Sequence, residues 1–340
     1  MGMDWHSSGI TTSVMGALKR AVNPHSKELG IYICGGKGKS SRNTPEELLR
    51  IGDRTGLDGN YLVRCSKLSA KIDNTAIQDG FQLYMHSFIV NNKAEWAVVQ
   101  QGMCGGTSTA RRYHWHSPTI SSFVDEPHAF IYGPNRGEIL NLVAHDAGKA
   151  RNVMMEMTRE SPQLMLKEAQ KLIMPIHHEV KAKDVDLKRL GAMLWLAHEK
   201  KPSDFAELLL LEGLGPRTLQ SLALVSEVIY GAPSRFKDPA RFSFAHGGKD
   251  GHPFPVPLNV YDETIGVLQK AVQQSKLGIN DKNEAIKRLS KISAQAEKDF
   301  IPNTNFEAVI AKERADSWKY GGRTVFGKSR PPVNQQLKLF

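Results

Sequence analysis

The sequence has little cysteine and no long apolar run, and each absence narrows the classes of protein to consider. Only three cysteines occur in 340 residues, and no two of them form a C-x-x-C pair. This pattern argues against a disulfide framework and a cysteine-based zinc site, and it favours a reducing cytosol. No apolar run reaches the roughly 18–20 residues of a membrane-spanning helix. The first residues, MGMDWHSSGITTSV, lack the basic-then-apolar order of a secretory signal. We therefore expect a cytoplasmic protein with no membrane partner.

Acidic residues are outnumbered by basic ones. The chain has 45 Lys and Arg against 35 Asp and Glu, which gives a formal net charge of +10. An excess of this size favours partners with dense negative charge, nucleic acid first and then acidic membrane or acidic protein. The length favours two domains, or one large domain with an appended helical part.

The residue pattern changes near position 138. Before it, GIYIC predicts a strand, and QLYMHSFIV and EWAVVQQG predict a β-hairpin around the polar turn NNKA. After it, apolar residues recur at helical spacing. We predict an α+β fold. Its parts are a mixed N-terminal domain with a hairpin or small sheet at 1–138, a mainly helical domain at 139–310 and a basic flexible tail at 311–340.

The stretch AELLLLEGLGPRTLQSLALVSEVIYG places two glycines and a proline between two apolar helical runs. Gly213 permits a tight turn, Gly215 keeps the Cβ atom out of the way, and Pro216 begins the second helix without losing a hydrogen bond. The free N–H groups of such a turn, with the helix dipole, attract a phosphate oxygen. We predict contact with the DNA backbone, without much sequence preference, through Gly213, Gly215, Arg217 and Thr218. The alternative is a packing corner inside the protein.

Several further phrases are distinctive in their order along the chain: DWHSSGITT, GGKGKSSRNTPEE, AKIDNTAIQDGFQLY, WAVVQQGM, ARRYHWH, HHE and FSFAHGGKDGHPFPV. The glycine-containing turn resembles a helix-hairpin-helix at 203–231. The whole set, from Asp4 to about Leu289, resembles the prokaryotic family catalogued as domain of unknown function 763. The resemblance implies a DNA-associated protein, suspected to be a nuclease, without naming its catalytic residues. It also implies a further N-terminal segment before DWHSSG, so we expect that segment to be missing here.

A nuclease of the metal-dependent kind needs acidic or imidazole ligands and cations beside the reacting phosphate. Carboxylates suit Mg²⁺ or Mn²⁺, the cofactors that we predict. The first phrase and the entry into the hairpin supply the candidate metal ligands: Asp4, His6, Asp73 and Asp79. The alternative is that the last two cap turns.

Lys71 stands two residues before Asp73, as a cation does beside the acids of restriction-type nuclease folds. The acid-x-lysine usual on the following strand of those folds is replaced by VVQQG, where Gln100 or Gln101 would position a water or a phosphate. The predicted catalytic set is Lys71, Asp73, Asp79, Gln100 and His114. The alternative for Lys71 is an ion pair with one of the two acids.

The phrase ARRYHWH alternates if it is extended. One face then carries Arg112, His114 and His116, which suit phosphate or metal, and the other carries Arg111, Tyr113 and Trp115, which would stack on a base or pack. Arg111 and Arg112 join the predicted DNA-binding set, and structural or solvated histidines are the alternative. In the phrase at 177–179, neighbouring side chains point apart, so at most one histidine joins Glu179 in a site.

Two glycine-lysine phrases add candidate phosphate contacts. GGKGKS lacks the P-loop spacing, because Ile33 stands where a glycine is required, so we do not expect an ATP site. Lys37 and Lys39 remain suited to nucleic-acid phosphate, as does Lys249 in HGGKDGHP. For the second phrase, a compact turn tied by Asp250 is the alternative.

Together these patterns predict a nucleoid-associated, divalent-metal-dependent DNA nuclease of repair or recombination. The first alternative is a non-catalytic DNA-binding or adaptor protein that uses the same turn. The second is a structural or protein-interaction role in which the turn is only a packing corner.

Overall fold

The computed structural model describes residues 5–104, 109–169, 187–240, 258–274 and 278–298, together with 315, 323–324 and 327–328. Contacts divide the chain into two compact units. One unit is Ile33–Arg241. The other combines Met1–Tyr32 with Phe242–Phe340.

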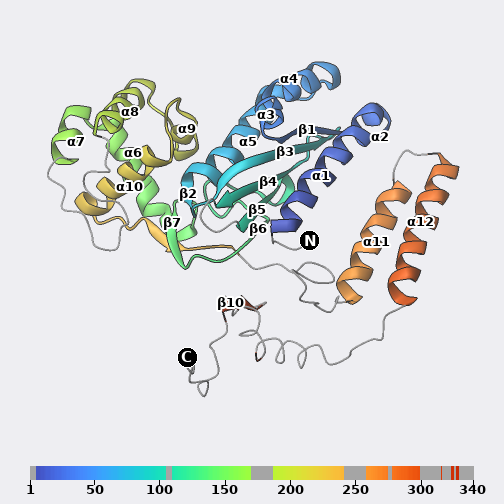
Figure 1. Ribbon diagram of the computed structural model, residues 1–340. Helices are drawn as coiled ribbons and strands as arrows, with labels where there is room; N and C mark the ends of the chain where they lie inside the picture. The colour runs from blue at the N-terminus through green and yellow to red at the C-terminus, as the bar shows by residue number, and fades with distance from the viewer. Residues whose placement is uncertain are drawn as a thin grey trace. The chain divides into compact units, whose positions relative to one another are not determined.

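A five-stranded sheet forms the centre of the Ile33–Arg241 unit, with the strand order β1-β3-β4-β5-β6 (Figure 1). Strands β3 to β6 pair antiparallel with their neighbours. The predicted hairpin is confirmed as β3 and β4, which pair from Gln82↔Met103 to Val90↔Trp96. The strand bounds are β1 (Ile31–Lys37), β3 (Gln82–Asn91), β4 (Trp96–Cys104), β5 (Thr109–His116) and β6 (Phe130–Tyr132).

Local sequence explains the hairpin and the helices beside the sheet. The Asn91 side chain accepts hydrogen bonds from the N–H groups of Lys93 and Glu95, which closes the polar turn. Helices α4 (Thr44–Thr55) and α5 (Gly59–Lys71) pack on each other, and α5 contacts β3 and β4. The Asp58 side chain accepts from the N–H of Tyr61 and so caps α5. A short helix, α3 (Lys39–Arg42), precedes α4.

At its C-terminal end α5 continues into a π-helical turn, η2 (Ile72–Ala76). This wider turn places Asp73 and Thr75 among buried residues. It leads into β2 (Ile77–Gln78), which pairs with β7 (Glu138–Asn141), and β7 pairs in turn with β8 (Arg235–Lys237). A second, three-stranded antiparallel sheet therefore joins segments from both ends of the unit.

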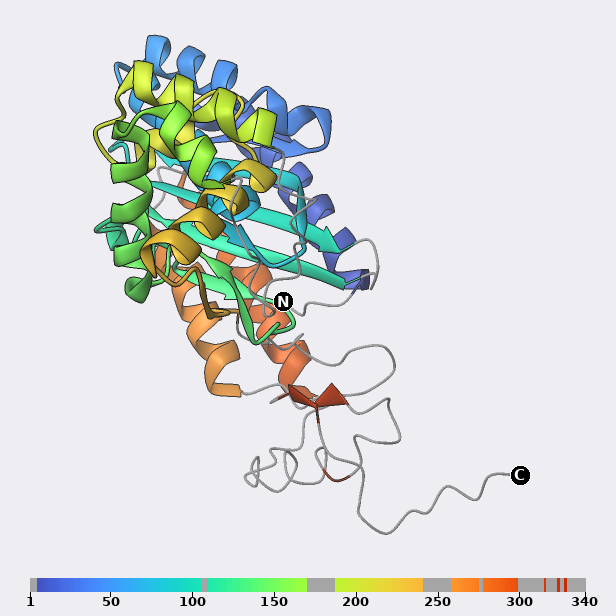
Figure 2. The same ribbon diagram turned by 90° about the vertical axis from the view of Figure 1, so that its left-hand side faces the viewer.

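The remaining helices of this unit form the group seen in green and yellow in Figures 1 and 2. They are α6 (Gly148–Arg159), α7 (Pro162–Ala169), α8 (Leu187–Lys200), α9 (Phe205–Leu210) and α10 (Pro216–Tyr230). An antiparallel sheet region followed by a helical part agrees with the predicted α+β class. The predicted domain boundary at 138/139 stays a prediction, and residues on both sides of it belong to one compact unit.

In the other unit the described elements are mostly helices. They are α1 (Trp5–Val22), α2 (Ser26–Leu29), α11 (Leu258–Gln274) and α12 (Ile279–Lys298), with α11 packed on α12, and the strand pair β9 (Arg323–Thr324) and β10 (Gly327–Lys328). Of all the helices described, none combines the length and the apolar character needed to cross a membrane.

Candidate functional site

Asp73 is fully buried at the η2 turn, and protein donors occupy its carboxylate. Its Oδ2 accepts from Gln100 Nε2 at 2.5 Å and from Trp115 Nε1 at 3.0 Å. Its Oδ1 lies 2.5 Å from His128 Nε2. Burial raises the pKa of Asp73, although the charge and hydrogen bond of His128 act in the opposite direction. A metal ion at Asp73 would have to displace these donors.

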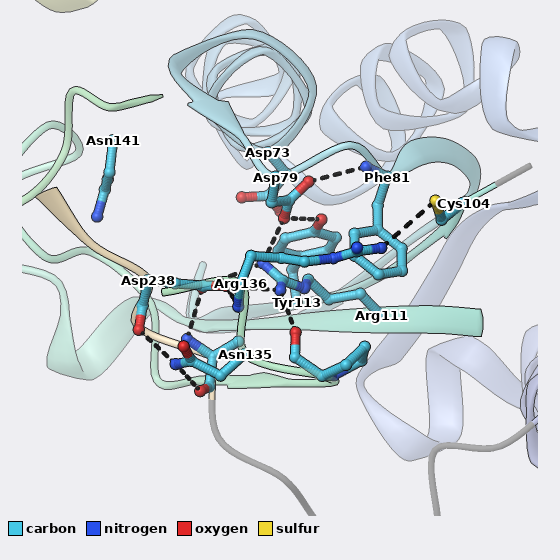
Figure 3. A network of polar contacts seen from close by, with 12 residues as sticks. Asp73, Asp79, Phe81, Cys104, Arg111, Tyr113, Asn135, Arg136, Asn141 and Asp238 are labelled. Carbon is cyan, nitrogen blue, oxygen red and sulfur yellow. Dashed lines mark hydrogen bonds and ion pairs between the residues drawn. The ribbon is translucent and has the colours of Figure 1, made fainter. Parts of the chain in front are cut away.

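Asp79 belongs to a separate buried network, drawn in Figure 3. Its Oδ2 accepts from Arg111 Nη1 at 2.7 Å and from Tyr113 Oη at 2.6 Å, and its Oδ1 accepts from the N–H of Phe81 at 3.0 Å. Arg111 also donates to both carboxylate oxygens of Asp238, at 3.1 and 2.7 Å. The Arg111 guanidinium lies over the Phe81 ring, 4.7 Å from its centroid. Burial raises the pKa of Asp79, against the effect of Arg111.

Asp238, in this network, is a residue that sequence reasoning missed. It follows β8 and lies 127 positions from Arg111 in the sequence, so no local pattern connects the two. Its Oδ2 also accepts from the N–H of Arg136 at 2.8 Å. The pairing of β7 with β8 brings Asp238 to the main sheet. His128 was missed for the same reason, because it contacts Asp73 across 55 positions.

The contact of Arg111 and Arg112 with DNA stays a prediction, and the burial of both residues does not favour it. Arg111 is 0% exposed and Arg112 is 2% exposed, so neither guanidinium is open to a phosphate. The predicted alternation along β5 is confirmed, since Arg111 and Tyr113 both bond to Asp79 while Trp115 on the same face bonds to Asp73. All three residues on this face therefore donate to carboxylates of the protein itself.

Of the predicted metal ligands, only Asp73 and Asp79 have side chains that the structure describes, and donors of the protein occupy both carboxylates. Asp73 and Asp79 lie in the two separate networks, and His114 points from the opposite face of β5 and contacts the Tyr132 ring edge-on at 5.4 Å. Burial lowers the pKa of His114 to about 4. Among the described side chains, no group of three His, Cys, Asp or Glu is arranged to hold a metal ion. Asp4 and the side chain of His6 lie outside the described residues, as does the phrase at 177–179.

A third set of buried polar groups connects α5 to β3 and β4. His86 Nε2 lies 2.8 Å from Ser66 Oγ, and His86 Nδ1 lies 2.9 Å from Gln100 Oε1. Gln100, a predicted catalytic residue, thus connects His86 to Asp73. Burial lowers the pKa of His86, so its imidazole is neutral at pH 7. Neither Ser66 nor His86 was singled out from the sequence, because a lone Ser and a lone His 20 positions apart give no pattern.

The turn between α9 and α10 is held to the protein by its apolar residue and by its carbonyl groups. Leu214 is buried, whereas Gly213, Pro216 and Arg217 are exposed. Lys71 Nζ donates to the carbonyl of Leu214 at 2.5 Å, so Lys71 is not paired with either predicted acid. Gln78 Nε2 donates to the carbonyl of Pro216 at 2.7 Å. Two carbonyl groups of the turn therefore already accept hydrogen bonds from side chains of α5 and β2.

Several N–H groups of the same turn, unlike these carbonyls, have no hydrogen-bond partner among the described residues. Pro216 begins α10, and Gly215 caps it without a side-chain hydrogen bond. Within the described part of the chain, the N–H groups of Gly213, Gly215 and Arg217 have no hydrogen-bond acceptor, while that of Leu214 bonds to Leu211. The dipole of this 15-residue helix adds positive potential at its N-terminus.

Two cavities adjoin the turn and share residues 212, 213, 215 and 216. One, which we call the α5 cavity, has a volume of about 760 Å³ and is lined by Arg42, Ser66, Lys67, Lys71 and His86, among others. The other, the α8 cavity, has a volume of about 580 Å³ and includes Arg189, Met193, Arg217 and Thr218. Basic side chains therefore line both sides of the turn.

The glycine-lysine loop does not present an open phosphate cradle. The N–H of Gly35 donates to the Glu47 carboxylate at 2.6 Å, and the N–H of Gly38 donates to the carbonyl of Tyr84 at 2.8 Å. The protein's own groups therefore fill two of the positions that a phosphate would use. The side chains of Lys37 and Lys39 are exposed, so their contact with nucleic acid stays a prediction. Lys249 lies outside the described residues.

Comparison with known proteins adds a family but no activity. No curated protein and no solved structure matches the chain. The family model described as "Protein of unknown function (DUF763)" matches residues 1–256. This match gives no support to the expectation of a missing N-terminal segment. Since it covers most of the 340 residues, the chain belongs to the DUF763 family of proteins of unknown function.

Proposed function

We propose that the protein binds the phosphate backbone of DNA at the turn between α9 and α10, in the manner of a helix-hairpin-helix. The proposal depends on a difference in hydrogen bonding between the carbonyl groups and the N–H groups of this turn. The carbonyls of Leu214 and Pro216 accept from Lys71 and Gln78, whereas the N–H groups of Gly213, Gly215 and Arg217 donate to no acceptor within the described residues. Such an arrangement suits an anion.

Charge supports the same proposal. Arg217 is exposed beside the free N–H groups, and the flanking cavities add Lys67, Lys71 and Arg189. The net charge of +10 favours approach of a polyanion. Contacts of this kind fix the protein on the backbone without reading bases, so we expect affinity with little sequence preference.

The test uses Gly215→Val. A Cβ atom at Gly215 meets no atom within 4 Å, and the residue does not have a positive φ, so the substitution adds bulk at the surface without an internal clash. We expect the double variant Gly215→Val/Arg217→Glu to unfold at the same temperature as the wild type. Its affinity for DNA should fall by at least about tenfold, equally for unrelated sequences, as expected for backbone contacts.

The matched control is Arg50→Glu, which reverses an exposed arginine on α4 that lines neither cavity. Affinity is measured by fluorescence anisotropy from 50 to 200 mM salt. Loss of one phosphate contact makes the negative slope of log K against log salt shallower by about 0.9. Equal affinities of the turn variant and the control would rule out the turn as the contact.

Magnesium- or manganese-dependent cleavage in DNA repair or recombination stays a separate prediction. The buried positions of Asp73 and Asp79 do not favour it, since side-chain hydrogen bonds already occupy their carboxylate oxygens. The non-catalytic alternative, a DNA-binding or adaptor protein, is the reading that the turn by itself supports.

A further inference from the structure

A serine and a histidine meet at the α5 cavity, beside the proposed DNA-binding turn. Ser66 lies within α5 and His86 lies on β3, and both line this cavity. Ser66 Oγ and His86 Nε2 are 2.8 Å apart, within hydrogen-bonding distance. The two residues are 3% and 6% exposed, so solvent and substrate reach the pair only through the cavity that it lines. A hydroxyl held against an imidazole at a cavity wall is the arrangement of an activated nucleophile.

The surrounding hydrogen bonds define which imidazole nitrogen carries the proton. Gln100 Nε2 lies within reach of two acceptors, the carbonyl of Ser69 at 3.2 Å and the Asp73 carboxylate at 2.5 Å. An amide nitrogen only donates, so Gln100 Oε1 faces His86 Nδ1, and the carbonyl oxygen requires a proton on that nitrogen. His86 Nε2 then has a free lone pair that accepts the hydroxyl proton of Ser66. This is the tautomer that a general base needs.

We propose that Ser66 is a nucleophile and His86 its general base, acting on a phosphodiester of the DNA strand bound at the α9–α10 turn. The proposal rests on the proposed function for its substrate. The cavity favours a phosphodiester over a neutral ester, because Arg42, Lys67 and Lys71 line it together with the pair. Such cations stabilise the extra negative charge that develops on phosphorus during displacement.

The proposed reaction needs neither a metal ion nor a redox partner. Ser66 Oγ attacks phosphorus as its proton passes to His86 Nε2. The bond from phosphorus to the departing sugar oxygen breaks, and this oxygen takes the proton from His86. Water then attacks the serine phosphodiester, gives its proton to His86, and the proton returns to Ser66 Oγ as the P–Oγ bond breaks.

The first experiment treats the full chain with a biotinylated fluorophosphonate, a reagent that phosphonylates activated serines, in the presence of EDTA. Tandem mass spectrometry of the wild type should locate the adduct on Ser66. Ser66→Ala should lose it, and His86→Gln should label at least about 100 times more slowly, the usual contribution of a general base. The matched control is Ser69→Ala, one turn further along α5, whose hydroxyl donates only to the carbonyl of Ser66.

The second experiment uses labelled DNA, again with EDTA so that metal-dependent cleavage does not contribute. Wild type and Ser69→Ala should cleave the strand or form a covalent adduct on Ser66, and Ser66→Ala should do neither while still binding DNA. Arg217→Glu, at a residue that lines the α8 cavity and not the α5 cavity, should weaken DNA binding but keep the fluorophosphonate adduct, so failure of the binding proposal is distinguished from failure of this one. Thermal unfolding confirms that each variant is folded.

The wild-type protein alone is enough to overturn the proposal. An unlabelled Ser66 excludes the activated nucleophile. A labelled Ser66 with no adduct and no cleavage of bound DNA excludes the phosphodiester substrate.

Discussion

Replacing Arg111 by methionine tests the conclusion that this arginine is a structural centre of the protein. Arg111→Met keeps a long side chain but removes the charge and every guanidinium donor. It leaves two carboxylates, Asp79 and Asp238, with side chains 1% and 0% exposed and no cation between them. The carbonyl of Pro134 also loses its donor. Removing one partner of a buried ion pair costs about 3–5 kcal/mol, because the remaining charge is uncompensated.

The expected change in melting temperature follows from the size of the folded unit. The Ile33–Arg241 unit falls in the size class of 150–250 residues. For a domain of this size, each kcal/mol of lost unfolding free energy lowers the melting temperature by about 2–4 °C. Arg111→Met should therefore lower it by about 6–20 °C. The matched control is Arg50→Met, which removes an exposed i,i+4 pair with Glu46. That pair contributes about 0.3–0.5 kcal/mol, equal to about 1–2 °C.

The destabilisation of Arg111→Met should shrink in acid. Burial already raises the pKa of Asp79, and removal of the arginine raises it further. The folded variant then binds protons that its unfolded chain does not, so its stability rises as pH falls from 7 toward 5. Melting curves by circular dichroism at both pH values measure the effect. A loss no larger than that of Arg50→Met, or a loss that does not change with pH, would refute the structural role of the Arg111 network.

Three further predictions concern single positions. Gly35→Ala should destabilise the protein by several times the roughly 1 kcal/mol expected for Gly56→Ala. Both glycines have a positive φ, so both substitutions strain the backbone. Only at Gly35 does the added Cβ atom also clash, because it would lie 2.2 Å from a main-chain oxygen of β3, whereas at Gly56 it meets nothing within 4 Å. Urea unfolding compares the two, and equal losses would contradict the clash. Burial lowers the pKa of His114 from 6.5 to about 4, so only the unfolded chain gains this proton as pH falls from 6.5. The resulting loss of stability, at most about 3 kcal/mol by pH 4, should be absent in His114→Gln, and parallel pH–stability curves for the two proteins would refute the shift. Lys71→Met removes both the donor that binds the carbonyl of Leu214 and a positive charge of the α5 cavity, so DNA affinity should fall; unchanged anisotropy would show that binding at the turn depends on neither.

Much of the local structure could be predicted from the sequence. The polar turn NNKA between two β-branched runs predicted the β3–β4 hairpin, and the alternation in ARRYHWH predicted which residues share a face of β5. Gly213, Gly215 and Pro216 predicted a turn that separates α9 from α10. These features depend on backbone preferences and side-chain periods within about ten residues, so the information lies in neighbouring positions.

The roles of the polar residues were decided by the tertiary structure. Asp73, Asp79 and Arg111 have the composition of a catalytic or nucleic-acid site, yet all three are sealed inside the sheet region by partners distant in sequence. Whether a carboxylate is open to a metal depends on what packs over it. That covering comes from strand pairings such as β7 with β8, which no local pattern specifies.

The sequence by itself determined the α+β class, the hairpin, the helix pair with its glycine turn and the family. Only the tertiary structure decided that Ser66, His86 and Gln100 form one chain of hydrogen bonds, since α5, β3 and β4 contribute one residue each. The physical reason is that helix and strand propensities act along the chain. Hydrogen bonds between buried side chains instead form between elements that the hydrophobic core brings together.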